Sequence, residues 1–153
     1  MTNIIEILIG QHNKLKEILV TTKEIANSGE KNYKEIVKKQ DEFTEKLTMH
    51  LELENNTFYP CLLAGWKKKN APETVIANKK MFVLEMKKIE LEVHEFLNKY
   101  KTVEKLEEHW KSYPDDLKMI INTLVFRVET EEDGIYMEWE IVGSQECLDE
   151  KSK

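Results

Sequence analysis

Apolar residues recur at spacings of three and four along most of this chain, which is the period of an amphipathic helix. In four segments the pattern persists long enough to predict a long helix. Residues that are typical of helix ends lie at the ends of these segments, for example Gly29 after the first and Pro72 at the start of the third. The pattern therefore predicts an all-α protein. The four segments cover about residues 3–27, 31–58, 72–100 and 114–142.

The connections between the long helices are short. Residues 59–71 contain Pro60 and Gly65 and are expected to form a loop or a short turn of helix. Residues 102–113 are expected to form a short surface helix. Connections of this length favour an antiparallel four-helix bundle with up-down-up-down order. We expect this bundle to be one domain over residues 1–142, followed by a loose polar tail over residues 143–153.

Composition and charge restrict the class of protein. A chain of 153 residues with 41% hydrophobic residues can fill one core, and the five Gly, three Pro and 34% charged residues suit a helical protein with a solvated surface. The net charge of −6 disfavours binding to nucleic acid. The chain also lacks a signal-peptide pattern and an apolar run of the ~18 residues that span a bilayer. We expect a cytoplasmic protein that binds neither nucleic acid nor membrane.

The two cysteines, Cys61 and Cys147, are not arranged in a C-x-x-C motif. Neither a zinc site nor a disulfide framework is indicated by this spacing. We expect both side chains to be reduced thiols.

Four titratable residues lie on the inner, otherwise apolar stripes of the predicted helices. His12 lies about nine residues from the start of the first helix and His50 about eight from the end of the second, so antiparallel packing brings them to one level. Glu54 and Glu131 reach the same level from the second and fourth helices. A single inward histidine is most simply a hydrogen-bonded core residue. Four buried ionisable groups together need a shared ligand or a mutual network, which favours a metal site.

A ten-residue element that occurs twice supports this interpretation. In the first copy, His50 and Glu54 form an H-x-x-x-E pattern that places both side chains on one helical face. In the second copy, 77 positions later, Glu131 matches Glu54 and Tyr136 matches Tyr59. An arginine, Arg127, stands in the second copy where the first has its histidine.

These residues resemble the hemerythrin-like, or HHE cation-binding, family, and the resemblance extends over nearly the whole chain. The matching features are a histidine in the first helix, the H-x-x-x-E motif followed by Phe58-Tyr59-Pro60, and a second such element in the fourth helix. The resemblance implies a non-haem di-iron centre that binds oxygen, nitric oxide or peroxide, or handles iron. Carried over by position, the matching ligands are His12, His50, Glu54 and Glu131.

Two positions depart from the family pattern. Met86 and Arg127 stand where the family places histidines in its third and fourth helices. Arginine is always protonated and thioether sulfur is a poor partner for iron, so the sequence predicts a reduced iron site with a single ion or none. Arg127 either points toward the two glutamates and replaces the metal charge, or lies at the edge of the bundle with its guanidinium in water.

Three functions are compatible with these residues. The first is a metal-binding protein with an atypical iron site, acting in oxygen, nitric oxide or redox sensing or in iron handling. The second is a metal-free structural bundle that binds a protein partner or a second copy of itself, and the third, weaker, is haem binding through a histidine and Met86. His94 and His109 are expected at the surface, and no motif indicates an enzyme.

Overall fold

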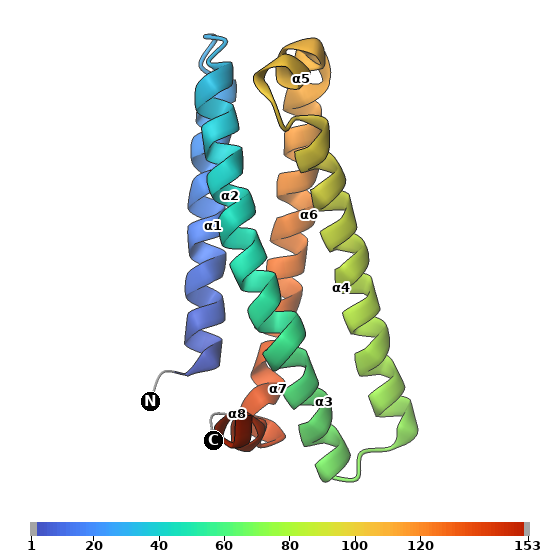
Figure 1. Cartoon of the computed structure of the whole chain (residues 1–153). Coiled ribbons are helices and arrows are strands. Elements are labelled where there is room, and N and C mark those ends of the chain that lie inside the picture. Colours follow the sequence, from blue (N-terminus) through green and yellow to red (C-terminus); the bar gives the residue numbers. More distant parts are fainter. Residues whose placement is uncertain (1–2, 152–153) are drawn as a thin grey trace.

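The computed structural model describes residues 3–151 of the chain. Over this range it contains helices and no strand, which confirms the all-α class. Four long helices lie side by side, and consecutive ones run in opposite directions (Figure 1). They are α1 (Ile4–Ala26), α2 (Tyr33–Leu53), α4 (Glu73–Lys99) and α6 (Tyr113–Asp133).

Shorter elements fill the connections and the C-terminal region. The first and third predicted helices end within one or two residues of α1 and α4, and the Asn3 side chain caps α1 by accepting a hydrogen bond from the Ile5 amide at 2.9 Å. The predicted surface helix over residues 102–113 consists of two short pieces. The shorter elements are η1 (Glu54–Phe58), α3 (Tyr59–Lys68), α5 (Val103–Glu108), η2 (Trp110–Ser112), η3 (Ile135–Met137), α7 (Glu138–Ile141) and α8 (Gln145–Lys151).

The second predicted helix continues further than residue 58. Helix α2 passes without a loop into the π-helical segment η1 and then into α3, so the expected loop or short turn after Phe58 is a helix of ten residues. Pro60 does not end the helix, because it directly follows the π-helical segment, where the hydrogen-bond pattern of the helix changes. The π-helical segment adds one residue to the turn, and the Tyr59 amide donates to the Glu54 carbonyl.

The fourth predicted helix stops earlier than expected. It ends at Asp133 rather than near residue 142, and the chain continues as η3 and α7. The break lies at Gly134, where a Cβ atom would be 2.8 Å from the Thr130 carbonyl oxygen. A bulkier residue would therefore not fit this turn.

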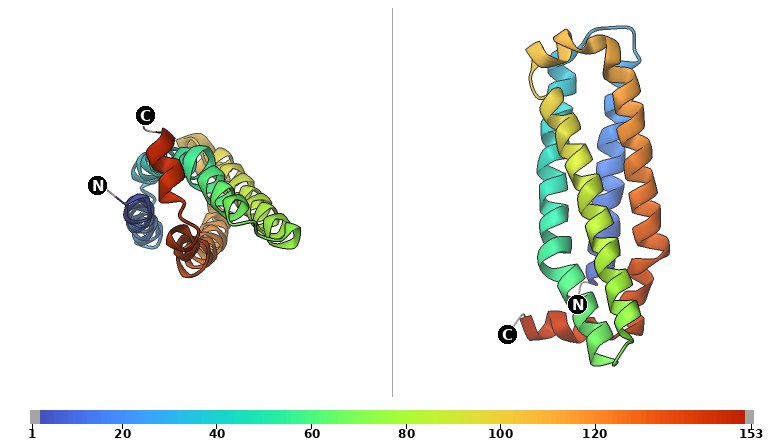
Figure 2. Two further views of the ribbon diagram at one scale, coloured as in Figure 1. Left: turned by 90° about the horizontal axis from the view of Figure 1, so that it is seen from below. Right: turned by 90° about the vertical axis from the view of Figure 1, so that its right-hand side faces the viewer.

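The C-terminal segment is helical and packed rather than loose. Helix α8 lies across the end of the long helices (Figure 2), and Cys147 on it forms a disulfide bond with Cys61 on α3. The expectations of a loose tail and of two reduced thiols are both wrong for the described residues. Sequence spacing missed the pair because its members are 86 positions apart and meet only when α8 folds back onto α3.

The apolar core has two parts, separated by a polar layer. One cluster contains Leu15 and Leu47, and the other contains Leu8 and Phe58. Three of the four long helices pass from one cluster toward the other through a buried polar residue, as α1 does at His12 between Leu8 and Leu15, whereas the buried residues of α4 are all apolar. The polar layer is therefore surrounded by apolar side chains above and below. Within residues 3–151, no helix is long and apolar enough to cross a lipid bilayer.

Gln40 secures the end of the bundle that lies opposite α8. Its side-chain amide donates to the Tyr100 carbonyl at 2.8 Å, and its Oε1 accepts from the Tyr113 hydroxyl at 2.7 Å. Gln40→Leu leaves both buried partners without a hydrogen bond, so we expect the free energy of unfolding to fall by about 1–3 kcal/mol. Urea denaturation measures this loss. Lys38→Leu, at an exposed position of the same helix, is the control and should change stability little; equal stability of the two variants would contradict the role of Gln40.

Candidate metal centre

The structure brings together the four residues that the sequence selects as ligands. His12 from α1, His50 from α2, Glu54 from η1 and Glu131 from α6 each direct one ligand atom into a cluster in which all four atoms lie within 4.8 Å of one another. All four side chains are buried. The predicted common level of these residues in the bundle is therefore observed.

The distances within the cluster are those of atoms in direct contact. The two imidazoles meet through their Nε2 atoms at 3.1 Å. Nε2 of His50 is 2.9 Å from Oε1 of Glu54, and Nε2 of His12 is 3.5 Å from Oε1 of Glu131. Each residue therefore contributes an atom with a lone pair to one small volume.

The outer nitrogen of each histidine has an oxygen partner. Nδ1 of His12 is 3.0 Å from a carboxylate oxygen of Glu132, and Nδ1 of His50 is 2.7 Å from the side-chain oxygen of Gln11. When each ring donates outward through Nδ1, its Nε2 presents a lone pair to the cluster. This is the arrangement in which imidazoles bind metal ions, with the second nitrogen held by a hydrogen bond.

Burial favours the neutral form of His12. Burial lowers the pKa of His12 below its ordinary value, although the neighbouring Glu132 opposes this shift. A neutral His12 ring with its proton on Nδ1 presents a lone pair to the cluster. Lone pairs that converge without a proton between them repel one another, and a cation would remove this repulsion.

Two tyrosines complete the carboxylate environment, each bonded to the glutamate of the other copy of the repeat. Tyr59 of the first copy donates to Oε2 of Glu131 at 2.8 Å, and Tyr136 of the second copy donates to Oε1 of Glu54 at 2.5 Å. The Tyr136 hydroxyl is also 3.2 Å from Nε2 of His12. Burial, reinforced by the charge of Glu54, raises the pKa of both hydroxyls, so both remain protonated donors.

Sequence analysis missed four of these residues as members of the site. The tyrosines had a usable signal, because they occupy equivalent positions in the two copies of the repeat. Gln11 and Glu132 had a weaker one: each is adjacent in sequence to a ligand position, but adjacent helical residues point about 100° apart and rarely share a site. The missed residues are Gln11, Tyr59, Glu132 and Tyr136.

Arg127 bridges the two glutamates. One terminal nitrogen donates to Oε2 of Glu54 at 2.8 Å, and Nε donates to Oε1 of Glu131 at 3.2 Å. The residue is 4% exposed, so the alternative in which its guanidinium reaches water is wrong. The other terminal nitrogen donates to the carbonyl of Met86 at 3.3 Å, which places the two substituted positions in direct contact.

The guanidinium and the two carboxylates form a coupled group. Burial and the charge of Glu54 raise the pKa of Glu131 well above its ordinary value. Burial also acts to raise the pKa of Glu54, but hydrogen bonds from Glu131 and His50 together with the charge of Arg127 hold it below the ordinary value. Arg127 therefore bridges two buried carboxyl groups whose pKa values are displaced in opposite directions.

The remaining histidines lie outside the cluster. His94 on α4 and His109 after α5 are both partly exposed, as expected from the sequence, and neither belongs to the group of four. The buried side chain of Met86 lies in the apolar cluster that contains Phe58.

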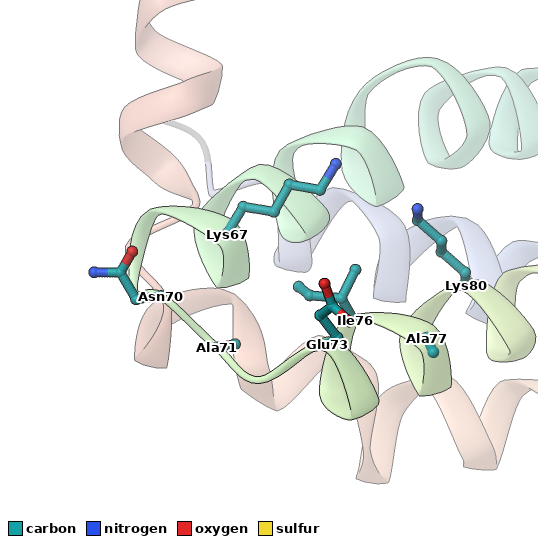
Figure 3. A pocket seen from close by; sticks show the side chains of 7 residues that line it. All are labelled: Lys67, Asn70, Ala71, Glu73, Ile76, Ala77 and Lys80. Carbon is teal, nitrogen blue, oxygen red and sulfur yellow. The ribbon is translucent and has the colours of Figure 1, made fainter.

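Two cavities differ in their relation to the centre. A cavity of about 580 Å³ lies between the end of α3 and the start of α4, where Lys67 and Lys80 flank Glu73 (Figure 3), and none of the four clustered residues lines it. An apolar cavity of about 230 Å³ lies between α1 and α6, and His12 is part of its wall. Exposed residues at its rim include Val20 and Val125. This second cavity reaches from the surface to a residue of the cluster.

The comparison with known families agrees with the geometry. The model of the hemerythrin HHE cation binding domain matches residues 3–139, which include all four clustered residues and both substituted positions. No curated protein and no solved structure matches the chain significantly. Because the match covers most of the sequence and the four matching ligand positions converge in the fold, the chain belongs to the hemerythrin HHE cation-binding family.

Proposed function

We propose that this protein binds a single non-haem iron ion through His12, His50, Glu54 and Glu131 and uses it to sense oxygen, nitric oxide or redox state, or to handle iron. The observation that carries the proposal is the convergence of four buried ligand atoms within 4.8 Å. The family match supports metal binding. The order of the long helices in Figure 1 supports an up-down-up-down bundle as the scaffold.

The donor set favours iron over softer metals. Two imidazole nitrogens with carboxylate oxygens suit non-haem iron, whereas the thiolates that select copper(I) are missing from the cluster. Outward hydrogen bonds from the histidines to Gln11 and Glu132 hold the rings in the orientation that binding requires. When bound, the metal would supply redox chemistry and a position for a small ligand.

A single ion fits better than two. The guanidinium of Arg127 contacts Oε2 of Glu54, while Oε1 of the same carboxylate faces His50. In a two-ion site the Glu54 carboxylate would bridge both metal ions. Here it lies between one metal position and the guanidinium of Arg127. A second cation next to Arg127 would be repelled and would find Met86 in place of an imidazole.

The apolar cavity beside His12 favours binding of a small neutral ligand. Its lining is formed mainly by aliphatic side chains, and it connects the surface between α1 and α6 with the wall of the cluster. Oxygen and nitric oxide are small and weakly polar and would enter such a cavity at little cost in desolvation. Location in the cytoplasm and binding without catalysis remain parts of this proposal.

The alternative is a metal-free bundle that has a structural role or binds a partner. Arg127 favours it, because its two bonds to Glu54 and Glu131 already supply the positive charge that these buried carboxylates need. In this case His12 and His50 are core residues that share a proton between their Nε2 atoms.

Metal content separates the two functions. Protein purified without oxygen or chelator should contain about one iron per chain, because Met86 and Arg127 remove ligands for a second ion. Elemental analysis measures this, and His50→Ala is the control that should lose the metal. About two irons per chain would contradict the single-ion site. Protein that neither contains iron nor binds added Fe²⁺ would support the metal-free alternative.

Removal of the guanidinium tests its role. Arg127→Ala leaves a buried carboxylate unpaired, so the metal-free protein should lose about 3–5 kcal/mol of unfolding free energy. Added Fe²⁺ should restore part of this loss, because a ligand that binds only the folded state stabilises it. Thermal melting with and without metal measures both effects, with Lys118→Ala on the exposed face of the same helix as control. An Arg127→Ala melt equal to that of the parent would show that the bridge contributes nothing.

Obstruction of the cavity mouth tests the ligand route. Val125→Trp should slow the association of nitric oxide with the iron(II)-loaded protein by roughly threefold or more, because the indole covers the opening. Stopped-flow absorption measures the rate. Phe126→Trp is the control, since this exposed neighbour does not line the cavity. Equal rates in the two variants would mean that the ligand enters elsewhere.

A further inference from the structure

The disulfide bond joins α3, directly after the first copy of the repeat, to α8, which lies beyond the second copy. Cys61 follows Tyr59 by two residues at the end of the first copy, and Cys147 lies on α8, beyond the end of the second. The disulfide bond thus connects α3 with the C-terminal segment at the end of the bundle that contains Tyr59 and Tyr136.

Aromatic contacts lead from this end of the bundle to the metal cluster. Trp139 stacks on Phe58 with ring centroids 5.2 Å apart, and its indole nitrogen donates to Gln145 at the start of α8 at 3.4 Å. Phe58 packs edge-on against both Tyr59 and Tyr136, at 5.3 and 5.0 Å. These are the two tyrosines that hold Glu131 and Glu54. Movement of the C-terminal segment would therefore reach the carboxylates through four adjacent rings.

Besides the disulfide bond, α8 is held by the packing of Leu148 against the apolar cluster that contains Phe58 and by a surface ion pair. The ion pair between Lys68 and Glu146 spans 3.0 Å, but its side chains are 65% and 63% exposed, so water screens it strongly. Gly65 allows close approach of Ser144 and Val142, since a Cβ atom there would lie 2.8 Å from both. The covalent bond is therefore the strongest connection between the two segments among the described residues.

The two sulfur atoms differ in accessibility. Cys61 is fully buried, whereas Cys147 is partly exposed. A soluble thiol would therefore reach Cys147 more readily than Cys61. In a reducing compartment, disulfides with an accessible sulfur cycle between two states rather than persist.

We propose that Cys61 and Cys147 form a redox switch that sets how tightly the metal cluster is closed. The oxidised pair fastens the C-terminal segment and, through Trp139 and Phe58, fixes the tyrosines that hold the two glutamates. The reduced pair releases α8, loosens this end of the bundle and lets the metal leave faster. The effect on metal rests on the proposed function, while the effect on the bundle end does not.

The chemistry requires a dithiol reductant. Its thiolate attacks the sulfur of Cys147, the disulfide bond breaks, and Cys61 leaves as a thiolate that takes up a proton. The second thiol of the reductant then attacks the mixed disulfide and releases Cys147, which is protonated in turn. The protein disulfide gains two electrons and two protons, and the dithiol becomes a disulfide.

The test compares metal-loaded protein with the disulfide intact, after reduction with a dithiol, and as the Cys61→Ala/Cys147→Ala variant. With Fe²⁺ as the probe and a coloured chelator in excess, release should be at least about tenfold faster in the second and third samples. Their melting temperature should be lower by roughly 5–15 °C. Hydrogen exchange should increase over residues 54–62 and 135–148 and remain unchanged in α5.

Two controls separate the switch from other effects. The dithiol should not alter the double alanine variant, which excludes a direct action on iron. Glu146→Gln removes the surface ion pair but keeps the disulfide, and it should release iron at the parent rate.

The outcomes distinguish this proposal from the preceding one. Equal exchange and equal release in the oxidised and reduced protein would overturn the switch. Faster hydrogen exchange at the α3–α8 end of the reduced protein, in a protein that binds no iron in either state, would support the redox switch and overturn the metal proposal instead.

Discussion

The polar layer of this bundle depends on the bridge that Arg127 forms between Glu54 and Glu131. Two carboxylates buried among apolar side chains cannot both be ionised without a nearby cation. The guanidinium satisfies this requirement on one side, while the opposite face of the same carboxylates points toward His12 and His50. The layer is thus built around the guanidinium on one side and the two imidazoles on the other.

This asymmetry would allow such a site to lose one of two metal positions without loss of the fold. The same two glutamates serve both flanks, so a metal ion can be exchanged for an arginine on one side only. The tyrosines strengthen this arrangement, because each copy of the repeat stabilises the glutamate of the other. Neither copy can form its half of the centre without its counterpart.

Sequence patterns predicted the helical class and the four clustered residues because both depend on local periodicity. The spacing of His50 and Glu54 fixes their common face, and the register of two antiparallel helices fixes the level of His12. The disulfide and the packed α8 were not predictable in this way, because they depend on how the chain turns after Gly134. The direction of Arg127 was also undecided, since helical position gives the face of a long side chain but not where its charged end lies.

The π-helical segment η1 gives the first repeat a particular helical phase. One additional residue in a helix rotates everything after it by about 100° relative to what precedes it. Glu54 is the first residue of this segment, and Tyr59 and Cys61 lie after it. Without the extra residue, α3 would keep its sequence and its helical form but would face another direction. Because of this offset, one continuous helix directs the Glu54 carboxylate into the polar layer and, farther along, the Cys61 sulfur toward Cys147 on α8.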